Sequence, residues 1–270
     1  MAPNRRPNRR PAVRTSWDPV AEWYQGMVGE GGHKYHQRVA IPALLELLRP
    51  QPDEEILDIG CGPGALAPAI SEAGARYTGV DASVRLLDFA REHHGGRGRF
   101  LLGDARNLAA LRELRAGAFD AATFLLSIQD MDPLREVLDS AAWAVRPGGH
   151  VAILMTHPCF RVPRQSGWGW DEGRKLRFRR VDRYLTPLPV PMKPYPGQTG
   201  VTRSFHRPLH EYVNGLAACG LLLDRMLELP TFEEHRGTEE ARADTLADRE
   251  IPLFLGLRAR KISYQVDLDI

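Results

Sequence analysis

A glycine-rich loop and three aspartates are the residues whose types and spacing most clearly indicate chemistry. The segment Asp58-Ile59-Gly60-Cys61-Gly62-Pro63-Gly64-Ala65 has glycines at alternate positions, which lets the backbone turn tightly and lets a ligand approach without a Cβ in its way. Asp81 follows Gly60 by about twenty residues, the spacing at which a carboxylate binds both hydroxyls of a ribose. Asp104, in Gly103-Asp104-Ala105, can accept a hydrogen bond from an adenine amino group. The set indicates a nucleoside ligand.

Two kinds of nucleoside ligand compete for this pattern. Gly60-x-Gly62-x-x-Ala65 with Asp81 also matches a dinucleotide-binding fingerprint, which supports a nicotinamide-dependent oxidoreductase. Asp58 favours a different ligand, because a carboxylate two residues before Gly60 would repel a pyrophosphate and attract a cationic amino group. No Lys-Ser/Thr pair follows the glycines, which excludes a P-loop. We therefore expect a nucleoside that carries an amino acid.

The elements that must position these residues alternate between strands and helices. Short strands are predicted at 56–59, 77–80, 99–102, 120–126 and 151–155, with helices at 66–72, 84–92, 108–114 and 134–145. This alternation indicates βαβ units, and therefore an α/β fold with a parallel sheet and helices on both faces. A ligand of such a sheet lies outside the carboxyl ends of the strands, where the glycine loop, Asp81 and Asp104 fall.

Two further segments frame the alternation. Residues 17–52 have the pattern of helices broken by glycines, and we expect an N-terminal helical cap there. Residues 156–204 are rich in proline and have no clean period, which predicts an insertion or lid after the fifth strand. A helix at 209–219 and strands at 221–229 and 250–260 follow. The expected parts are a basic tail (1–16), the cap (17–52), the main domain (53–262, lid at 156–204) and a C-terminal tail (263–270).

These motifs together resemble those of class I S-adenosylmethionine-dependent methyltransferases. The resemblance rests on Asp58-x-Gly60-x-Gly62-x-Gly64, Asp81, Gly103-Asp104-Ala105, Phe119-Asp120 and Arg146-Pro147-Gly148-Gly149, and it covers about 17–261. It implies a Rossmann-like, seven-stranded, mostly parallel sheet whose last strand is antiparallel. It also implies S-adenosyl-L-methionine as the cofactor.

The flanking segments resemble the type-11 group of small-molecule methyltransferases. Those segments are Trp17-x-x-Val20-Ala21-x-Trp23-Tyr24, similar to a helix that closes over the cofactor, His157-Pro158-Cys159-Phe160 and His206-Arg207-Pro208-Leu209. By this resemblance the cofactor-binding residues are Tyr24, Tyr35, Asp58, Gly60, Cys61, Gly62, Asp81, Ala82, Asp104, Ala105 and Leu125. Asp81 would hold the ribose and Asp104 the adenine, while Asp58 and the glycine loop would face the methionine end.

Methyl transfer from a sulfonium is an in-line displacement, in which the protein aligns the nucleophile and removes a proton where needed. It requires no metal, and no cluster in the sequence has metal-ligand spacing. His157 directly follows the fifth strand and is the preferred catalytic base or ligand, with His206 second; a role in holding the lid explains His157 equally well. Tyr24 and Tyr35 can stabilise the sulfonium, although helix packing explains each of them too.

Residues 174–183 form the most basic segment of the predicted fold. Their alternation predicts a strand or hairpin. We rank three interpretations: a lid edge whose arginines pair with nearby acids, then a clamp for an anionic group of the substrate, then RNA binding. The expected substrate contacts are Gln129, Arg161 and Trp168. Gln129 stands where the usual type-11 pattern has a histidine.

Composition narrows the remaining classes. The chain has 270 residues, 36 Lys and Arg against 34 Asp and Glu, and three distant cysteines, which favours a reducing, cytoplasmic compartment. No apolar run reaches the roughly 20 residues that span a bilayer, and the arginines of 1–14 indicate a solvated tail. We expect an enzyme that methylates a small molecule, with an anionic one as an option, on oxygen, nitrogen or carbon. An RNA methyltransferase, an NAD(P)-dependent oxidoreductase and a non-catalytic nucleoside-binding module are the alternatives.

Overall fold

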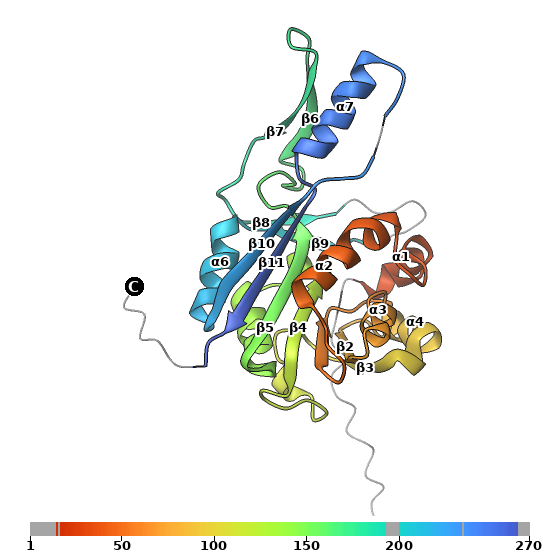
Figure 1. The fold of residues 1–270 in the computed structure, drawn as a ribbon, viewed down its shortest axis with the longest axis vertical. Coiled ribbons are helices and arrows are strands. Elements are labelled where there is room, and N and C mark those ends of the chain that lie inside the picture. Colours follow the sequence, from red (N-terminus) through yellow and green to blue (C-terminus); the bar gives the residue numbers. More distant parts are fainter. Residues whose placement is uncertain (1–14, 16, 193–199, 234, 264–270) are drawn as a thin grey trace, which may run out of the picture.

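A seven-stranded sheet forms the centre of the computed structural model, which describes residues 15, 17–192, 200–233 and 235–263 (Figure 1). Its strands are β1 (Glu55–Ile59), β2 (Arg76–Asp81), β3 (Gly98–Leu102), β4 (Phe119–Leu125), β5 (Val145–Thr156), β10 (Leu221–Leu229) and β11 (Phe254–Lys261), in the order β10-β11-β5-β4-β1-β2-β3. Strand β1 is parallel to β2 and β4, whereas β11 is antiparallel to β5 and β10. The predicted sheet, mostly parallel with an antiparallel last strand, is confirmed.

Helices cover both faces of this sheet, as expected. Helices α2 (Ile41–Leu48), α3 (Ala67–Glu72) and α4 (Val84–His94) pack on one face, and α5 (Leu134–Ala144) and α6 (Leu209–Ala218) on the other. Side chains of β1 alternate between the two faces. Ile56 packs in the hydrophobic core under α2, α3 and α4, and Leu57 and Ile59 pack in the core under α5 and α6. Because both faces are covered, β1 is buried almost throughout, and a polar residue inside it, Asp58, is exceptional.

The N-terminal part is helical and interrupted by glycine, as predicted. A 3-10 turn (Asp18–Val20) leads into α1 (Ala21–Val28), and a π-helical stretch (His36–Ala40) leads into α2. Gly29, with φ +66°, ends α1, because glycine adopts this left-handed conformation without steric cost. The cap therefore consists of separate short helices rather than one long helix.

The insertion after β5 contains two hairpins. Strand β6 (Ser166–Asp171) pairs antiparallel with β7 (Leu176–Val181), and β8 (Leu188–Pro191) with β9 (Arg203–His206). The hairpin predicted for the basic segment is confirmed. Helix α7 (Glu239–Glu250), between β10 and β11, packs on β7. The β6–β7 hairpin and α7 project together above the sheet (Figure 1), and we call them the lobe.

The helix predicted at 108–114 is wrong. This segment forms a 3-10 turn at Leu108–Ala110 and then further turns, with Leu111 N donating to Leu108 O (3.0 Å) and Leu114 N to Leu111 O (3.1 Å). The three leucines are buried. Their spacing of three suits 3-10 geometry, in which residues three apart share a face, rather than the 3.6 residues per turn of an α-helix.

Helix α7 is absent from the sequence-based prediction, which has a strand from 250. Thr238 caps α7 by accepting from Ala241 N (3.1 Å), with Glu239 and Glu240 in the first turn. A hydroxyl cap and acidic residues at a helix N-terminus were available signals. Apart from residues 15 and 263, the predicted tails lie outside the described residues, as do residues 193–199 of the predicted lid. In the described ranges, no helix is long and apolar enough to cross a bilayer.

Candidate active site

A cavity of about 300 Å³ lies at the carboxyl ends of β1, β2, β3 and β4. The strand ends contribute Gly60, Gly62, Asp81, Ala82, Asp104, Ala105 and Leu125, the cap contributes Trp17 and Tyr24, and β9 contributes Arg203 and Phe205. This is the expected ligand crevice of an open α/β sheet. Segments far apart in the sequence, the cap and the insertion, therefore complete the wall of one cavity.

Two glycines shape the loop after β1 in different ways. At Gly60 (φ +74°), a Cβ would lie 2.5 Å from Met131 Cε and 2.7 Å from Ser127 Cβ, so no larger residue fits. At Gly62 (φ +53°), the nearest atom to a Cβ would be Tyr24 Cε1 at 3.9 Å. A side chain there would enter the cavity that Gly62 lines. The backbone at Gly62 is thus open to a ligand, as a cofactor-binding loop requires.

The carboxylate of Asp81 lies at the end of β2 with both oxygens oriented by the backbone. Its Oδ2 accepts from Gly62 N (2.9 Å) and its Oδ1 from Ser83 N (2.8 Å). Burial raises the pKa of Asp81, and these N–H donors partly offset the rise. Each carboxylate oxygen has a further lone pair, so Asp81 can still accept from two hydroxyls of a ligand in the cavity.

Asp104 lies two residues beyond the end of β3, on the same wall, and is kept ionised by a neighbour. Arg106 Nη2 lies 2.6 Å from Asp104 Oδ2, and Arg106 N donates to Asp104 Oδ1 (2.9 Å). This arginine lowers the pKa of Asp104. Both residues line the cavity, so Asp104 presents an acceptor that stays charged over the physiological pH range.

Asp58 in β1 and Cys61 in the glycine loop do not line the cavity. The Asp58 carboxyl is 1% exposed, its Oδ2 accepts from Tyr77 Oη (2.7 Å), and its Oδ1 has no partner. Burial raises the pKa of Asp58 to about 7 and raises that of the Cys61 thiol as well. An unpaired carboxylate oxygen just before this loop in the chain suits a cationic amino group, and the contact of Asp58 with the methionine end remains a prediction.

We expect Asp58→Asn to remove a pH-dependent loss of stability. A carboxyl whose pKa is raised from near 3.9 to about 7 stabilises the fold below about pH 4, and this contribution is lost as the pH rises toward 7. Between pH 4 and 7 the free energy of unfolding should fall further in the wild type than in the variant, by up to about 4 kcal/mol. Urea unfolding at several pH values measures the difference. The same pH dependence of unfolding free energy in wild type and variant would contradict the raised pKa of Asp58.

His157 and His206 are buried but do not line the cavity. His157 Nδ1 accepts from Cys159 N (3.2 Å) and its Nε2 lies 3.0 Å from Glu228 Oε1, which leaves neither ring nitrogen for a substrate. Burial lowers the pKa of His157, and Glu228 partly offsets this. His206 Nε2 donates to Tyr184 O (2.7 Å). The contact of His157 connects the insertion to β10, and that of His206 connects two parts of the insertion, as the lid-holding interpretation predicts. A catalytic role of either residue stays a prediction.

Of the two tyrosines expected at the sulfonium, Tyr24 lines the cavity and Tyr35 does not. The ring of Tyr24 lies edge-on to Trp17 with centroids 5.0 Å apart. Tyr35 packs on Phe232 (centroids 5.3 Å apart), and its Oη donates to Glu233 Oε1 (3.3 Å). The structure therefore brings Tyr24 to the cavity and places Tyr35 against the segment that leads into α7.

None of the three expected substrate contacts lines the cavity. Gln129 lies in the turn after β4, where its Nε2 donates to Leu126 O (2.6 Å). Arg161 and Trp168 lie together at the base of the lobe, with the guanidinium 5.1 Å from the indole centroid. Direct contact of these residues with the acceptor therefore remains a prediction.

Asp130 is a cavity residue that the sequence analysis missed. It ends the 3-10 turn Ile128–Asp130 after β4 and is half-buried. Burial raises its pKa to about 7, against a hydrogen bond from Ser204 that lowers it. The available signal was a carboxylate in the first turn beyond the fourth strand, one residue from Gln129. Among the described residues, no group of three or more His, Cys, Asp or Glu is arranged to hold a metal ion.

Comparison with known proteins identifies the class. An S-adenosylmethionine-dependent methyltransferase of Mesorhizobium loti has a similar structure, with a TM-score of 0.64 and 26% identity over 81% of this chain and 96% of that one. The fold is thus the one seen in this S-adenosylmethionine-dependent methyltransferase. Residues 57–153 match the family described as methyltransferase domain.

Curated relatives match only part of the chain. A ubiquinone biosynthesis O-methyltransferase of Sodalis glossinidius is 28% identical over 151 residues, 56% of this chain and 61% of that protein. A malonyl-acyl-carrier protein O-methyltransferase of Salmonella typhimurium is 33% identical over 130 residues, 46% of this chain and 50% of that protein. The chain therefore matches less than two thirds of the length of either relative.

Proposed function

We propose that this protein transfers the methyl group of S-adenosyl-L-methionine to an oxygen atom of a small molecule. The observation that carries the proposal is the Asp81 carboxylate, oriented by Gly62 N and Ser83 N on the wall of a cavity that Asp104 also lines. These are the acceptors that a ribose and an adenine need at the ends of β2 and β3. The names of both curated relatives support oxygen as the acceptor atom.

In this proposal, some cavity side chains bind the cofactor and another removes a proton from the acceptor. The bound cofactor supplies a methyl group on a sulfonium. Asp81 accepts from the ribose hydroxyls, Asp104 accepts from the adenine amino group, and Tyr24 provides an aromatic wall beside Gly62. Asp130, with its pKa near 7, accepts the proton that an acceptor hydroxyl loses during transfer. Residues of the cap and of β9 complete the lining of the cavity.

The acceptor we propose is an anionic small molecule rather than RNA. In the segment 174–183, several cations already have carboxylate partners: Lys175 with Glu172, Arg177 with Asp244, and Arg180 with Asp182. Paired cations contribute little to the counterion release that drives binding to nucleic acid. No contact of the described residues favours RNA.

Calorimetric titration should show micromolar binding of both S-adenosyl-L-methionine and S-adenosylhomocysteine, about −8 kcal/mol. NAD should show no heat of binding, because Asp58 in β1, just before the glycine loop, disfavours a pyrophosphate. Binding of NAD without a response to S-adenosyl-L-methionine would overturn the proposed function.

A further inference from the structure

Three guanidinium groups surround one indole ring in the lobe. Trp168 of β6 lies opposite Arg179 of β7, and Arg177 lies two residues along on the same face of the hairpin. The guanidinium carbons of Arg177, Arg161 and Arg179 are 4.6, 5.1 and 5.2 Å from the indole centroid. All four side chains are partly exposed. Three like charges therefore share one accessible surface, which we call the arginine cluster.

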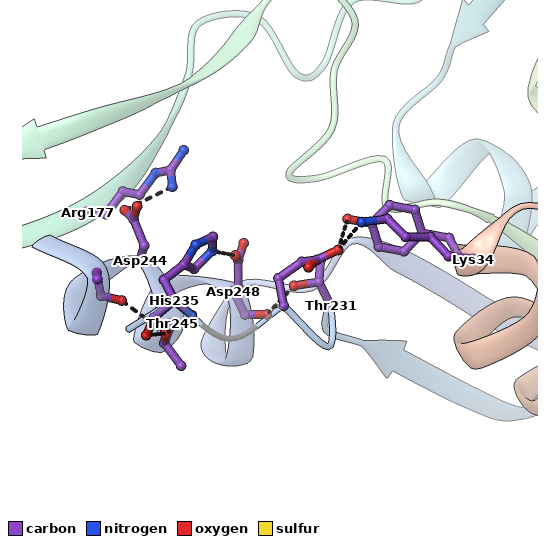
Figure 2. Close-up of polar contacts among 10 residues, drawn as sticks. Lys34, Arg177, Thr231, His235, Asp244, Thr245 and Asp248 are labelled. Carbon is purple, nitrogen blue, oxygen red and sulfur yellow. Dashed lines mark hydrogen bonds and ion pairs between the residues drawn. The ribbon is translucent and has the colours of Figure 1, made fainter. Parts of the chain in front are cut away.

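The positive charge of the arginine cluster is only partly neutralised. Arg177 pairs with Asp244 of α7 at 2.9 Å (Figure 2). Arg179 donates to a backbone carbonyl and to a serine hydroxyl, both at 2.8 Å and both uncharged. Arg161 makes no hydrogen bond or ion pair with the described residues, and its buried Nε has no partner. The cluster thus has donors without acceptors.

The remaining charges near the cluster do not supply those acceptors. Asp248 of α7 faces Arg161 and favours its charge, but this carboxylate pairs with His235 at 3.0 Å (Figure 2). Burial, followed by the charge of Arg179, lowers the pKa of Arg161 to about 10, and burial and Arg177 lower that of Arg179. Without a ligand, the charges of Arg161 and Arg179 are therefore less stable here than in water, although Arg161 stays charged at neutral pH.

We propose that Arg161, Arg177 and Arg179 bind an oxyanion, a carboxylate or a phosphate, beside the ring of Trp168. The planar guanidinium presents paired N–H donors that match the oxygens of either group, and such an anion supplies the acceptors that Arg161 lacks. Arg161 follows the end of β5, the strand next to β4 at the cavity. We assign the anion to the methyl acceptor; this assignment rests on the proposed function, whereas the anion site does not.

The test is a titration of the full chain with inorganic phosphate and, separately, with malonate, at constant ionic strength. Nuclear magnetic resonance of the arginine Nε–H groups reports binding directly. Arg161→Gln should weaken binding about tenfold or more, the value of one lost charge-assisted hydrogen bond. Arg180→Gln is the matched control, because Arg180 lies on the opposite face of β7 and its side chain is 70% exposed. It should bind like the wild type.

Thermal unfolding without ligand separates an anion site from simple packing on Trp168. If the cluster awaits an anion, Arg161→Gln relieves repulsion and raises the melting temperature by a few degrees. A lower melting temperature, or equal anion binding by wild type and Arg161→Gln, would contradict the site. Arg161→Lys, which keeps the positive charge but loses the paired N–H donors of the guanidinium, should bind with intermediate affinity. The stronger of the two probes tells a phosphate ligand from a carboxylate.

The two proposals fail separately. A protein that binds S-adenosyl-L-methionine but neither anion contradicts the anion site alone. A protein that binds an anion through Arg161 but not S-adenosyl-L-methionine contradicts the proposed function and leaves the anion site standing.

Discussion

Asp81→Ala is expected to weaken S-adenosyl-L-methionine binding by about a hundredfold. The carboxylate accepts from both ribose hydroxyls in the proposed complex, and hydrogen bonds to a charged group contribute about 1.5–3 kcal/mol each. Its geometry is already set by Gly62 N and Ser83 N, so no reorganisation is needed on binding. Calorimetric titration measures the loss.

Two variants control this experiment. Asp81→Asn keeps an acceptor oxygen without the charge and should lose less affinity than the alanine variant. Asp53→Ala removes an exposed carboxylate that pairs with Arg76 at the opposite end of β2 and should change nothing. Circular dichroism confirms that each variant is folded. An unchanged affinity in folded Asp81→Ala would refute the ribose assignment.

Asp130→Asn is expected to lower methyl transfer by about 10²-fold while leaving cofactor affinity within a few-fold of the wild type. The asparagine keeps the shape of the side chain but cannot accept a proton, and general base catalysis contributes at least this much. Because the pKa of Asp130 is about 7, the wild-type rate should rise with pH through that value, and this rise should be absent in the variant. Release of S-adenosylhomocysteine, with an acceptor found by screening hydroxyl compounds, measures the rate.

Ser204→Ala and His157→Gln test the same assignment from two sides. The hydrogen bond from Ser204 lowers the pKa of Asp130, so its removal should move the rise in rate to higher pH. His157 contacts Cys159 N and Glu228, and its replacement should reduce stability more than turnover. A larger loss of turnover in His157→Gln than in Asp130→Asn would show that Asp130 is not the general base and would favour His157, the residue that the sequence predicts.

The positions of Asp81 and Asp104 on one cavity wall were predictable because each residue lies at the carboxyl end of its own strand. Asp81 is the last residue of β2 and Asp104 lies two residues beyond β3, and a parallel sheet places those ends side by side without further information. The glycine loop is equally local, since its conformation depends on glycines within one turn. Sequence spacing was sufficient for these residues to be brought to one cavity.

The residues expected at the sulfonium and at the acceptor depend on contacts that sequence spacing does not reveal. Tyr35 packs on Phe232, almost 200 residues later in the chain. His157, just after β5, contacts Glu228 of β10 across the intervening strand β11. In the turn after β4, Gln129 and Asp130 are adjacent, and a 3-10 turn directs one to the backbone and the other to the cavity. Such a choice is made by packing, for which neighbouring residues give no periodic signal.

The position of α7 between β10 and β11 has a consequence for how proteins of this kind can diverge. Leu229 and Phe254 are partners in the antiparallel register, so the ends of the segment 230–253 are only about 5 Å apart, one strand spacing. A turn of two to five residues closes such a gap in an ordinary hairpin. Exchange, shortening or growth of this segment during evolution therefore leaves the register of the sheet and the cofactor cavity intact. Half of the lobe can thus be lost or replaced as a unit without a new fold.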